Sequence, residues 1–305
     1  MPSHFADRLF AAASQKGAPV CVGIDPVLTR LPESIRTGVN PRSAAACADA
    51  IRRYVERLLR AVAPLVPCVK FQSACYERYR GPGVAVLSDM VHLARDLGLL
   101  VITDAKRGDI GISAEHYAAA HLADDGFDDQ PTHAADALTV SPYLGPDTLE
   151  PFLDASVDQG KGLFVLVRTS NPGSDAFQSQ RMASGVTLSE HVAAAVRDLG
   201  RRAGAMGEQG YSLVGAVVGA TKPADLAALR SVMPEQVFLV PGFGTQGGTA
   251  EDVRACFDTQ GRGALITASR SVIFAYEKRS EARWEDAVSA AAREMATEVM
   301  QVVAQ

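Results

Sequence analysis

The chain has 305 residues, of which 47% are hydrophobic and 21% are charged, a composition typical of a water-soluble globular protein. Its net charge of -5 argues against nucleic acid as a partner, and no run of about 18 apolar residues predicts a membrane span. Charged residues near the start do not fit a signal peptide. The five cysteines lack C-x-x-C spacing, which favours free thiols, so we expect a cytoplasmic protein without membrane partners.

Short β-branched runs of strand length alternate along the chain with longer amphipathic segments rich in Ala and Leu. The predicted strands are residues 20–25, 66–71, 99–104, 137–141, 162–167, 213–218, 237–240 and 264–267. Helices are expected near residues 43–62, 84–97, 112–123, 147–158, 186–204, 223–231, 248–256 and 283–303. Eight such units predict an α/β fold, a (β/α)8 TIM barrel. We expect residues 1–305 to form a single domain with an N-terminal helical extension at about 1–18.

Three stretches interrupt this alternation. Gly81-Pro82-Gly83 predicts a break within the second crossover, and the acidic segment 124–131 predicts an exposed connection. The segment 168–185 is rich in Ser, Asn, Pro and Gly and is long for a barrel loop. A loop of that length is typical of a lid over a functional site.

Barrels of this class carry their chemistry at the C-terminal ends of the strands, and charged residues gather there. The first strand ends at Asp25, the second contains Lys70, and the third leads into Asp104, Lys106 and Asp109. A lysine inside an apolar strand needs an acidic partner, which Asp25 or Asp104 offers. If the third strand continues, alternation puts Asp104 and Lys106 on the same side. This cluster indicates a site that controls charge on a substrate, with a surface salt-bridge network as the alternative.

The seventh strand runs into the glycine-rich segment 241–248, and the eighth runs into Arg270. Glycines let an anion approach the backbone closely, a following helix offers free N–H groups, and Arg270 adds a forked donor. Loops seven and eight are also where barrels commonly bind phosphate, so we expect a phosphate group here. The six histidines show no ligand spacing, and we expect no metal site.

Five motifs in this order resemble the orotidine 5'-phosphate decarboxylase family, in particular its longer bacterial branch. They are Gly23-Ile24-Asp25-Pro26, Val69-Lys70-Phe71, the run from Asp104 to Gly111, Thr169-Ser170-Asn171-Pro172-Gly173, and the run from Pro241 to Gly248. The resemblance covers nearly the whole chain. It implies conversion of orotidine 5'-monophosphate to UMP and CO2 in de novo pyrimidine biosynthesis, without metal or organic cofactor, in a homodimer.

The resemblance also implies roles for individual residues. Lys106 would protonate C6 of the substrate, and Asp104 would lie near the substrate carboxylate. Asp109 and the hydroxyl of Ser113 would reach across the dimer interface into the partner's site; the family more commonly has threonine at the position of Ser113. The other substrate-binding residues would contact ribose (Asp25, Lys70), pyrimidine (Ser170) and phosphate (Gln246, Gly247, Arg270). Because loss of CO2 leaves a carbanion in the ring plane, a fixed ammonium there would help.

Two other functions are compatible with parts of this pattern. Magnesium-dependent sugar-phosphate decarboxylases and hexulose-phosphate aldolases share the Asp-x-Lys-x-x-Asp signature, but they need an acidic metal ligand where this chain has Lys70. A barrel that only binds nucleotides is the other alternative, although the complete charge array would then have little purpose.

Overall fold

The computed structural model describes residues 3–124, 134–220, 223–242, 251–279, 281 and 283–304. Eight parallel strands form a closed barrel in sequence order, with β1 also paired to β8. The strands are β1 (Val20–Ile24), β2 (Cys68–Gln72), β3 (Leu100–Arg107), β4 (Ala137–Val140), β5 (Gly162–Arg168), β6 (Ser212–Val218), β7 (Gln236–Pro241) and β8 (Ala264–Ala268). The predicted (β/α)8 barrel is confirmed.

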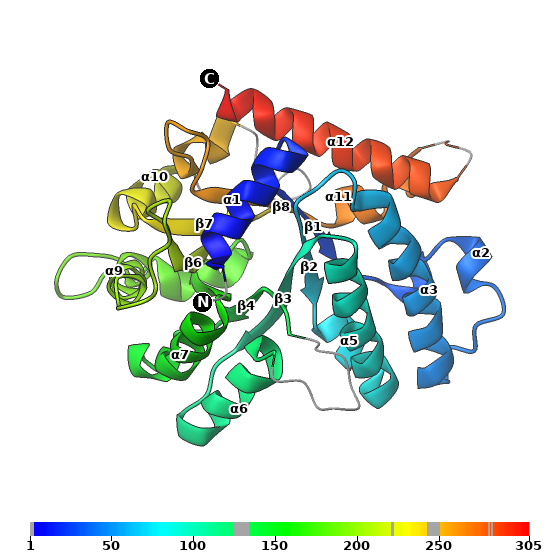
Figure 1. Ribbon diagram of the computed structural model, residues 1–305, viewed down its shortest axis with the longest axis horizontal. Helices are drawn as coiled ribbons and strands as arrows, with labels where there is room; N and C mark the ends of the chain where they lie inside the picture. The colour runs from blue at the N-terminus through cyan, green and yellow to red at the C-terminus, as the bar shows by residue number, and fades with distance from the viewer. Residues whose placement is uncertain are drawn as a thin grey trace.

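Helices form the outer ring around this barrel (Figure 1). The longer ones are α1 (Phe5–Lys16), α3 (Ala44–Val62), α5 (Arg80–Asp96), α6 (Gly111–Leu122), α7 (Glu150–Gln159), α9 (Leu188–Gly200), α10 (Pro223–Val232) and α12 (Trp284–Val303). Four one-turn helices are α2 (Glu33–Arg36), α4 (Ala74–Glu77), α8 (Asp175–Gln178) and α11 (Arg270–Ile273). Short 3-10 helices are η1 (Leu28–Arg30), η2 (Pro146–Leu149), η3 (Pro172–Ser174), η4 (Glu251–Cys256) and η5 (Ala275–Glu277).

Three predictions about local structure need correction or fall outside the described residues. The expected break at Gly81-Pro82-Gly83 is wrong, because α5 begins at Arg80 and contains all three residues in its first turn. Proline is tolerated there, since the first N–H groups of a helix have no partner within the helix. The helix expected at 248–256 is, from residue 251, the 3-10 helix η4. Most of the connection predicted at 124–131 lies outside the described residues.

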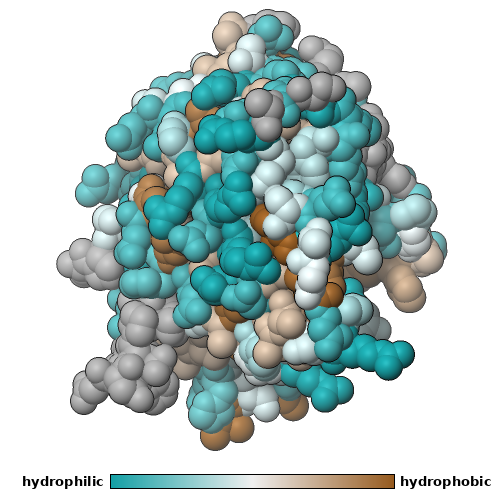
Figure 2. All heavy atoms as spheres, turned by 90° about the vertical axis from the view of Figure 1, so that its right-hand side faces the viewer, coloured by the Kyte–Doolittle hydropathy of each residue, from teal (hydrophilic) through white to brown (hydrophobic). Residues whose placement is uncertain are grey.

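The barrel strands are apolar almost throughout because the sheet is covered on both faces. Every residue of β1, β6 and β8 is buried. The outer helices are two-sided. In α3, Ile51, Val55 and Leu58 are buried, whereas the opposite face carries the ion pair of Arg53 with Asp49 at 3.0 Å. Figure 2 shows the mainly hydrophilic surface on this side of the molecule.

Helix α1 closes the end of the barrel at which the strands begin (Figure 1). The Phe5 ring packs edge-on against Phe164, with 5.8 Å between the ring centroids. Gly162 opens β5, and a Cβ atom there would lie 2.4 Å from the Phe5 ring, so glycine makes room for this helix. Arg8 adds an ion pair of 2.5 Å with the buried Asp136, just before β4. The opposite end, where the strands finish, is therefore left for a site.

None of the helices within the described ranges is both long and apolar enough to span a lipid bilayer.

Candidate active site

A cavity of about 330 Å³ opens at the C-terminal ends of the strands. Its lining residues come from the ends of β1, β2, β3, β5, β7 and β8 and from the segments that follow them. They are Asp25, Lys70, Gln72, Asp104, Ser170, Pro241, Gly242, Thr267, Ala268, Ser269 and Arg270. Five side chains expected at the site thus share one cavity. A larger hollow of about 650 Å³ lies outside the barrel beside α9, and none of the described residues that line it is Asp, Glu, Lys or Arg.

Asp104 is the centre of the polar contacts in this cavity. Its Oδ2 lies 2.6 Å from Nζ of Lys70, and its Oδ1 lies 2.5 Å from Nζ of Lys106. The hydroxyl of Thr139 also donates to Oδ1, at 2.9 Å. The side-chain amide of Gln72 donates to the backbone carbonyl of Asp104 at 3.0 Å. Both carboxylate oxygens are therefore occupied by donors, and two of these donors are cations.

The opposite charges of Asp104 and the neighbouring lysines keep Asp104 and Lys70 ionised. Burial alone would raise the pKa of Asp104, but the charges of Lys70 and Lys106 outweigh burial and lower it to about 2. Burial alone would lower the pKa of Lys70, but Asp104 and Asp25 outweigh it and raise that pKa above its usual value. At neutral pH the cavity therefore holds an ionised carboxylate and an ionised ammonium side by side.

The two lysines differ in exposure. The side chain of Lys70 is only 7% exposed, whereas that of Lys106 is 45% exposed. Strand β3 continues through Arg107, and Lys106 does lie on the side of Asp104, as expected for a continuing strand, although the pairing with β4 shifts register between Thr103 and Arg107. Lys106 has a φ of +50°, a left-handed conformation that is uncommon outside glycine. Lys70 is thus a buried partner of Asp104, whereas Lys106, which is not among the described residues that line the cavity, contacts Asp104 with a partly exposed ammonium.

Beside β1, Asp25 and the turn after β8 line the same cavity. Among the described residues, Oδ1 of Asp25 is buried and has no hydrogen-bond partner. A Cβ atom on Gly23 would lie 1.9 Å from the hydroxyl of Ser269, so glycine lets this turn approach β1. Arg270 follows as the first residue of α11, and it is exposed. An acidic side chain and a basic side chain, Asp25 and Arg270, thus line the same cavity.

The residues expected to act across an interface do not line this cavity. Oδ1 of Asp109 accepts a hydrogen bond from the N–H of Ile110 at 2.8 Å. Ser113 lies exposed near the start of α6. The two remaining residues expected to bind substrate, Gln246 and Gly247, lie outside the described residues.

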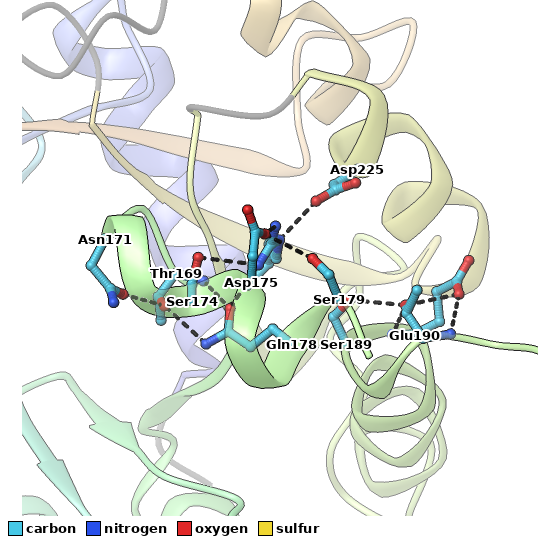
Figure 3. A network of polar contacts seen from close by, with 11 residues as sticks. Thr169, Asn171, Ser174, Asp175, Gln178, Ser179, Ser189, Glu190 and Asp225 are labelled. Atoms are coloured by element: carbon cyan, nitrogen blue, oxygen red, sulfur yellow. Dashed lines mark hydrogen bonds and ion pairs between the residues drawn. The ribbon is translucent and has the colours of Figure 1, made fainter. Parts of the chain in front are cut away.

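The predicted lid corresponds to the segment between β5 and α9, residues 169–187, which Figure 3 shows from close by. Its anchor is Arg168, the last residue of β5, which is 1% exposed. The guanidinium pairs with Asp175 in the segment and with Asp225 of α10, the latter at 2.7 Å. Gln178 also accepts from the N–H of Thr169, at 2.9 Å. These contacts attach the start of the segment, which includes Ser170, to β5 and α10.

Two residues that touch Asp104 were not expected from the sequence. Gln72 follows Lys70 by two positions, so strand alternation could have put both side chains on the same side. Thr139 gave no such signal, because β4 is buried throughout and a single threonine fits a buried strand without any special role. Within the described ranges, no three His, Cys, Asp or Glu side chains form a group that could hold a metal ion.

The closed barrel, with a cavity at its mouth that is lined by ammonium and carboxylate groups, defines the chain as a (β/α)8-barrel enzyme. Comparison with known proteins narrows this class of enzyme to one family. The model of the Orotidine 5'-phosphate decarboxylase / HUMPS family matches residues 18–284, and the chain belongs to this family.

Relatives of known name support the assignment to this family. Orotidine 5'-phosphate decarboxylase of Rhodopirellula baltica is 43% identical over 297 residues, which cover 95% of this chain and 97% of that protein. The Deinococcus radiodurans enzyme of the same name is 42% identical over 275 residues, covering 90% and 91%. A crystal structure from Streptomyces avermitilis, provisionally assigned as the same enzyme, superimposes with a TM-score of 0.84 at 33% identity, covering 100% of this chain and 98% of that one.

Proposed function

We propose that this chain is an orotidine 5'-phosphate decarboxylase, which converts orotidine 5'-monophosphate to UMP and CO2 in de novo pyrimidine biosynthesis. The observation that carries the proposal is the Asp104 carboxylate held between Lys70 and Lys106 at the barrel mouth, at 2.6 and 2.5 Å. The names of the relatives, at up to 43% identity over most of the chain, select the nucleotide among the possible substrates.

The reaction needs one charge and one proton, and Lys106 supplies both. When the bond from C6 to the carboxylate breaks, CO2 leaves and the electron pair remains on C6 in the plane of the ring. An ammonium fixed beside C6 stabilises that charge as it develops. Lys106 then transfers a proton to C6, and its amine regains a proton from water. Asp104 keeps Lys106 aimed, because their charged groups lie 2.5 Å apart.

The other cavity residues hold the nucleotide. Asp25 and Lys70 bind the ribose; both line the cavity, and a carboxylate accepts hydrogen bonds from hydroxyl groups. Ser170 bonds the pyrimidine, held next to the anchor at Arg168. Arg270, with Gln246 and Gly247, binds the phosphate. Binding energy at the phosphate then contributes to assembling the charged site, which raises the chemical rate.

The ion pairs also argue against the metal-dependent alternatives. A magnesium-dependent sugar-phosphate enzyme needs free carboxylate oxygens near the end of β2. Here Lys70 stands in that region and binds one oxygen of Asp104, and Lys106 and Thr139 bind the other. A cation next to Lys70 would be repelled. No cofactor is therefore proposed.

Two copies of the chain form the working enzyme in this proposal. The surface around α6 is apolar where an interface would lie: Ile110 is 64% exposed and Ile112 is 68% exposed. Asp109 and Ser113 flank these residues, and each would reach the site of the partner. The free thiols of the chain suit a reducing compartment, and we place the enzyme in the cytoplasm.

A mixed-chain experiment tests the exchange of Asp109. Chains with Lys106→Ala and chains with Asp109→Ala are each inactive in this account. In a mixed dimer, the Asp109→Ala chain contributes an intact Lys106, and its partner contributes an intact Asp109, so one complete site forms. Co-refolding the two variants should restore about a quarter of wild-type activity, as expected for random pairing with one complete site in half of the dimers. No restored activity would contradict sharing across the interface.

The proposed function itself is tested with the unmodified protein. Loss of orotidine 5'-monophosphate is followed by ultraviolet absorbance in EDTA, and UMP is identified as the product. A hexulose 6-phosphate serves as the competing substrate. Turnover of the nucleotide that survives EDTA supports the proposal. Turnover only of the sugar phosphate, only with added magnesium, or nucleotide binding without turnover would overturn it.

A further inference from the structure

Strands β3 and β4 lose their regular register next to the charged cluster. Thr103 pairs with Leu138, but the next recorded pair is Arg107 with Val140. Three residues of β3, positions 104 to 106, therefore lie opposite the single residue Thr139 of β4. Such a bulge re-aims the side chains of the bulged strand. Here it carries Lys106, whose φ of +50° departs from strand geometry.

The side chain of Thr139 bridges this bulge. Its hydroxyl accepts a hydrogen bond from the backbone N–H of Lys106 at 3.0 Å and donates one to Oδ1 of Asp104 at 2.9 Å. That same Oδ1 lies 2.5 Å from Nζ of Lys106. The contacts close a ring that runs from the Lys106 backbone through Thr139 and Asp104 to the Lys106 ammonium. Thr139 is 1% exposed, so water cannot easily replace either contact.

A hydroxyl suits this position because it donates and accepts at the same time. Valine has nearly the same shape, but it would leave the N–H of Lys106 without this acceptor and Oδ1 of Asp104 without this donor. Nothing else in the described part of β4 contacts either group through a hydrogen bond of its side chain.

We propose that Thr139 is a positioning residue for proton transfer, which holds the bulged backbone of Lys106 and the Asp104 carboxylate in register so that the ammonium points at C6. This inference rests on the proposed decarboxylase function. Thr139 touches no substrate in it. It acts through Lys106, so its loss affects the chemical step more than the binding of product.

The test compares Thr139→Val with Thr139→Ser, which keeps the hydroxyl. Thr148→Val is the matched control, because Thr148 is also buried and its hydroxyl donates to a backbone carbonyl, that of Gly145, at 2.7 Å. We expect Thr139→Val to lower kcat about 10- to 100-fold, in line with two lost hydrogen bonds of which one reaches a charged group. KM and the affinity for UMP should change less than about threefold, and Thr139→Ser should recover most of kcat.

The kcat values and UMP affinities of these variants decide whether Thr139 has a positioning role or a general packing role. A wild-type kcat in Thr139→Val would overturn the positioning role while leaving the proposed function intact. Equal losses in kcat and UMP affinity, or a kcat in Thr139→Ser as low as in Thr139→Val, would show a general packing role instead. If Thr148→Val lost as much kcat as Thr139→Val, the effect would not be local. Failure of the proposed function has a different signature, because then the wild-type protein would not turn over orotidine 5'-monophosphate at all.

Discussion

Replacing Lys70 with methionine removes one of the two ammonium groups that hold Asp104 ionised, while keeping a side chain of similar length. The pair is buried, with side chains 7% and 10% exposed and 2.6 Å between Nζ and Oδ2. The lowering of the Asp104 pKa from 3.8 to about 2 corresponds to about 2 kcal/mol of stabilisation at neutral pH. The variant also leaves a buried charge with one partner fewer, so the unfolding free energy should fall by about 3–5 kcal/mol.

The sign of the pH dependence follows from the pKa of Asp104. In the wild-type protein, the stabilisation by Asp104 is present above pH 3.8 and is lost as the pH falls through about 2. In Lys70→Met, Asp104 keeps Lys106 but loses the charge of Lys70, so the pKa of Asp104 rises above its wild-type value and protonation relieves the less compensated buried charge as the pH falls from neutral. The stability difference between the two proteins should therefore be largest near neutral pH and shrink in mildly acidic solution.

Urea unfolding followed by circular dichroism measures this difference at two pH values. Lys16→Met is the control, because the hydrogen bond that Lys16 makes within the described ranges goes to an uncharged group, the backbone carbonyl of Ala63, at 2.9 Å. That variant should lose about 1 kcal/mol or less, with no marked pH dependence. A Lys70→Met protein as stable as wild type at neutral pH, or a loss that does not change with pH, would refute the account of the buried pair.

Three further predictions concern the ligand and the lid. Arg270→Ala should weaken binding of UMP about 10- to 100-fold in calorimetry and leave uridine binding unchanged; an equal effect on both would contradict the phosphate role. Asp25→Asn should weaken UMP about 10-fold but not inorganic phosphate, and a loss for phosphate alone would contradict the ribose role. Arg168→Met should speed proteolytic cleavage within residues 169–187 at least about 10-fold, because a buried ion-pair anchor is lost; an unchanged cleavage rate would contradict the anchor.

The sequence was sufficient to predict the barrel because its strands are buried on both faces and appear as apolar runs. The one-turn helices α2, α4, α8 and α11 were missed, since four residues are too few to display a helical period. The strand predicted at 99–104 ended too early, because β3 continues to Arg107. This extension includes Lys106, whose φ of +50° has no signal in the sequence. Gly81-Pro82-Gly83 was misinterpreted because both glycine and proline also occur in a first helical turn.

The sequence predicted those site residues that are charged and lie in or just after a strand. Lys70 stood out as a cation in an apolar strand, and Asp25 and Asp104 stood at strand ends, so their shared cavity follows from the topology of a barrel. Thr139 could not be found this way. Its role depends on a register shift between two strands and on a hydroxyl that meets two groups, which are properties of the folded chain.

The most direct measurement of the central claim is kcat for orotidine 5'-monophosphate in Lys106→Ala, without metal and beside the wild-type protein. The variant should keep its fold, because Asp104 retains Lys70, and circular dichroism and UMP binding verify this. As a control, Lys278→Ala removes an exposed lysine outside the cavity and should turn over substrate like the wild type. We predict that kcat of Lys106→Ala falls by at least about 10²-fold. A folded Lys106→Ala protein with wild-type kcat would contradict the claim that this ammonium supplies the proton.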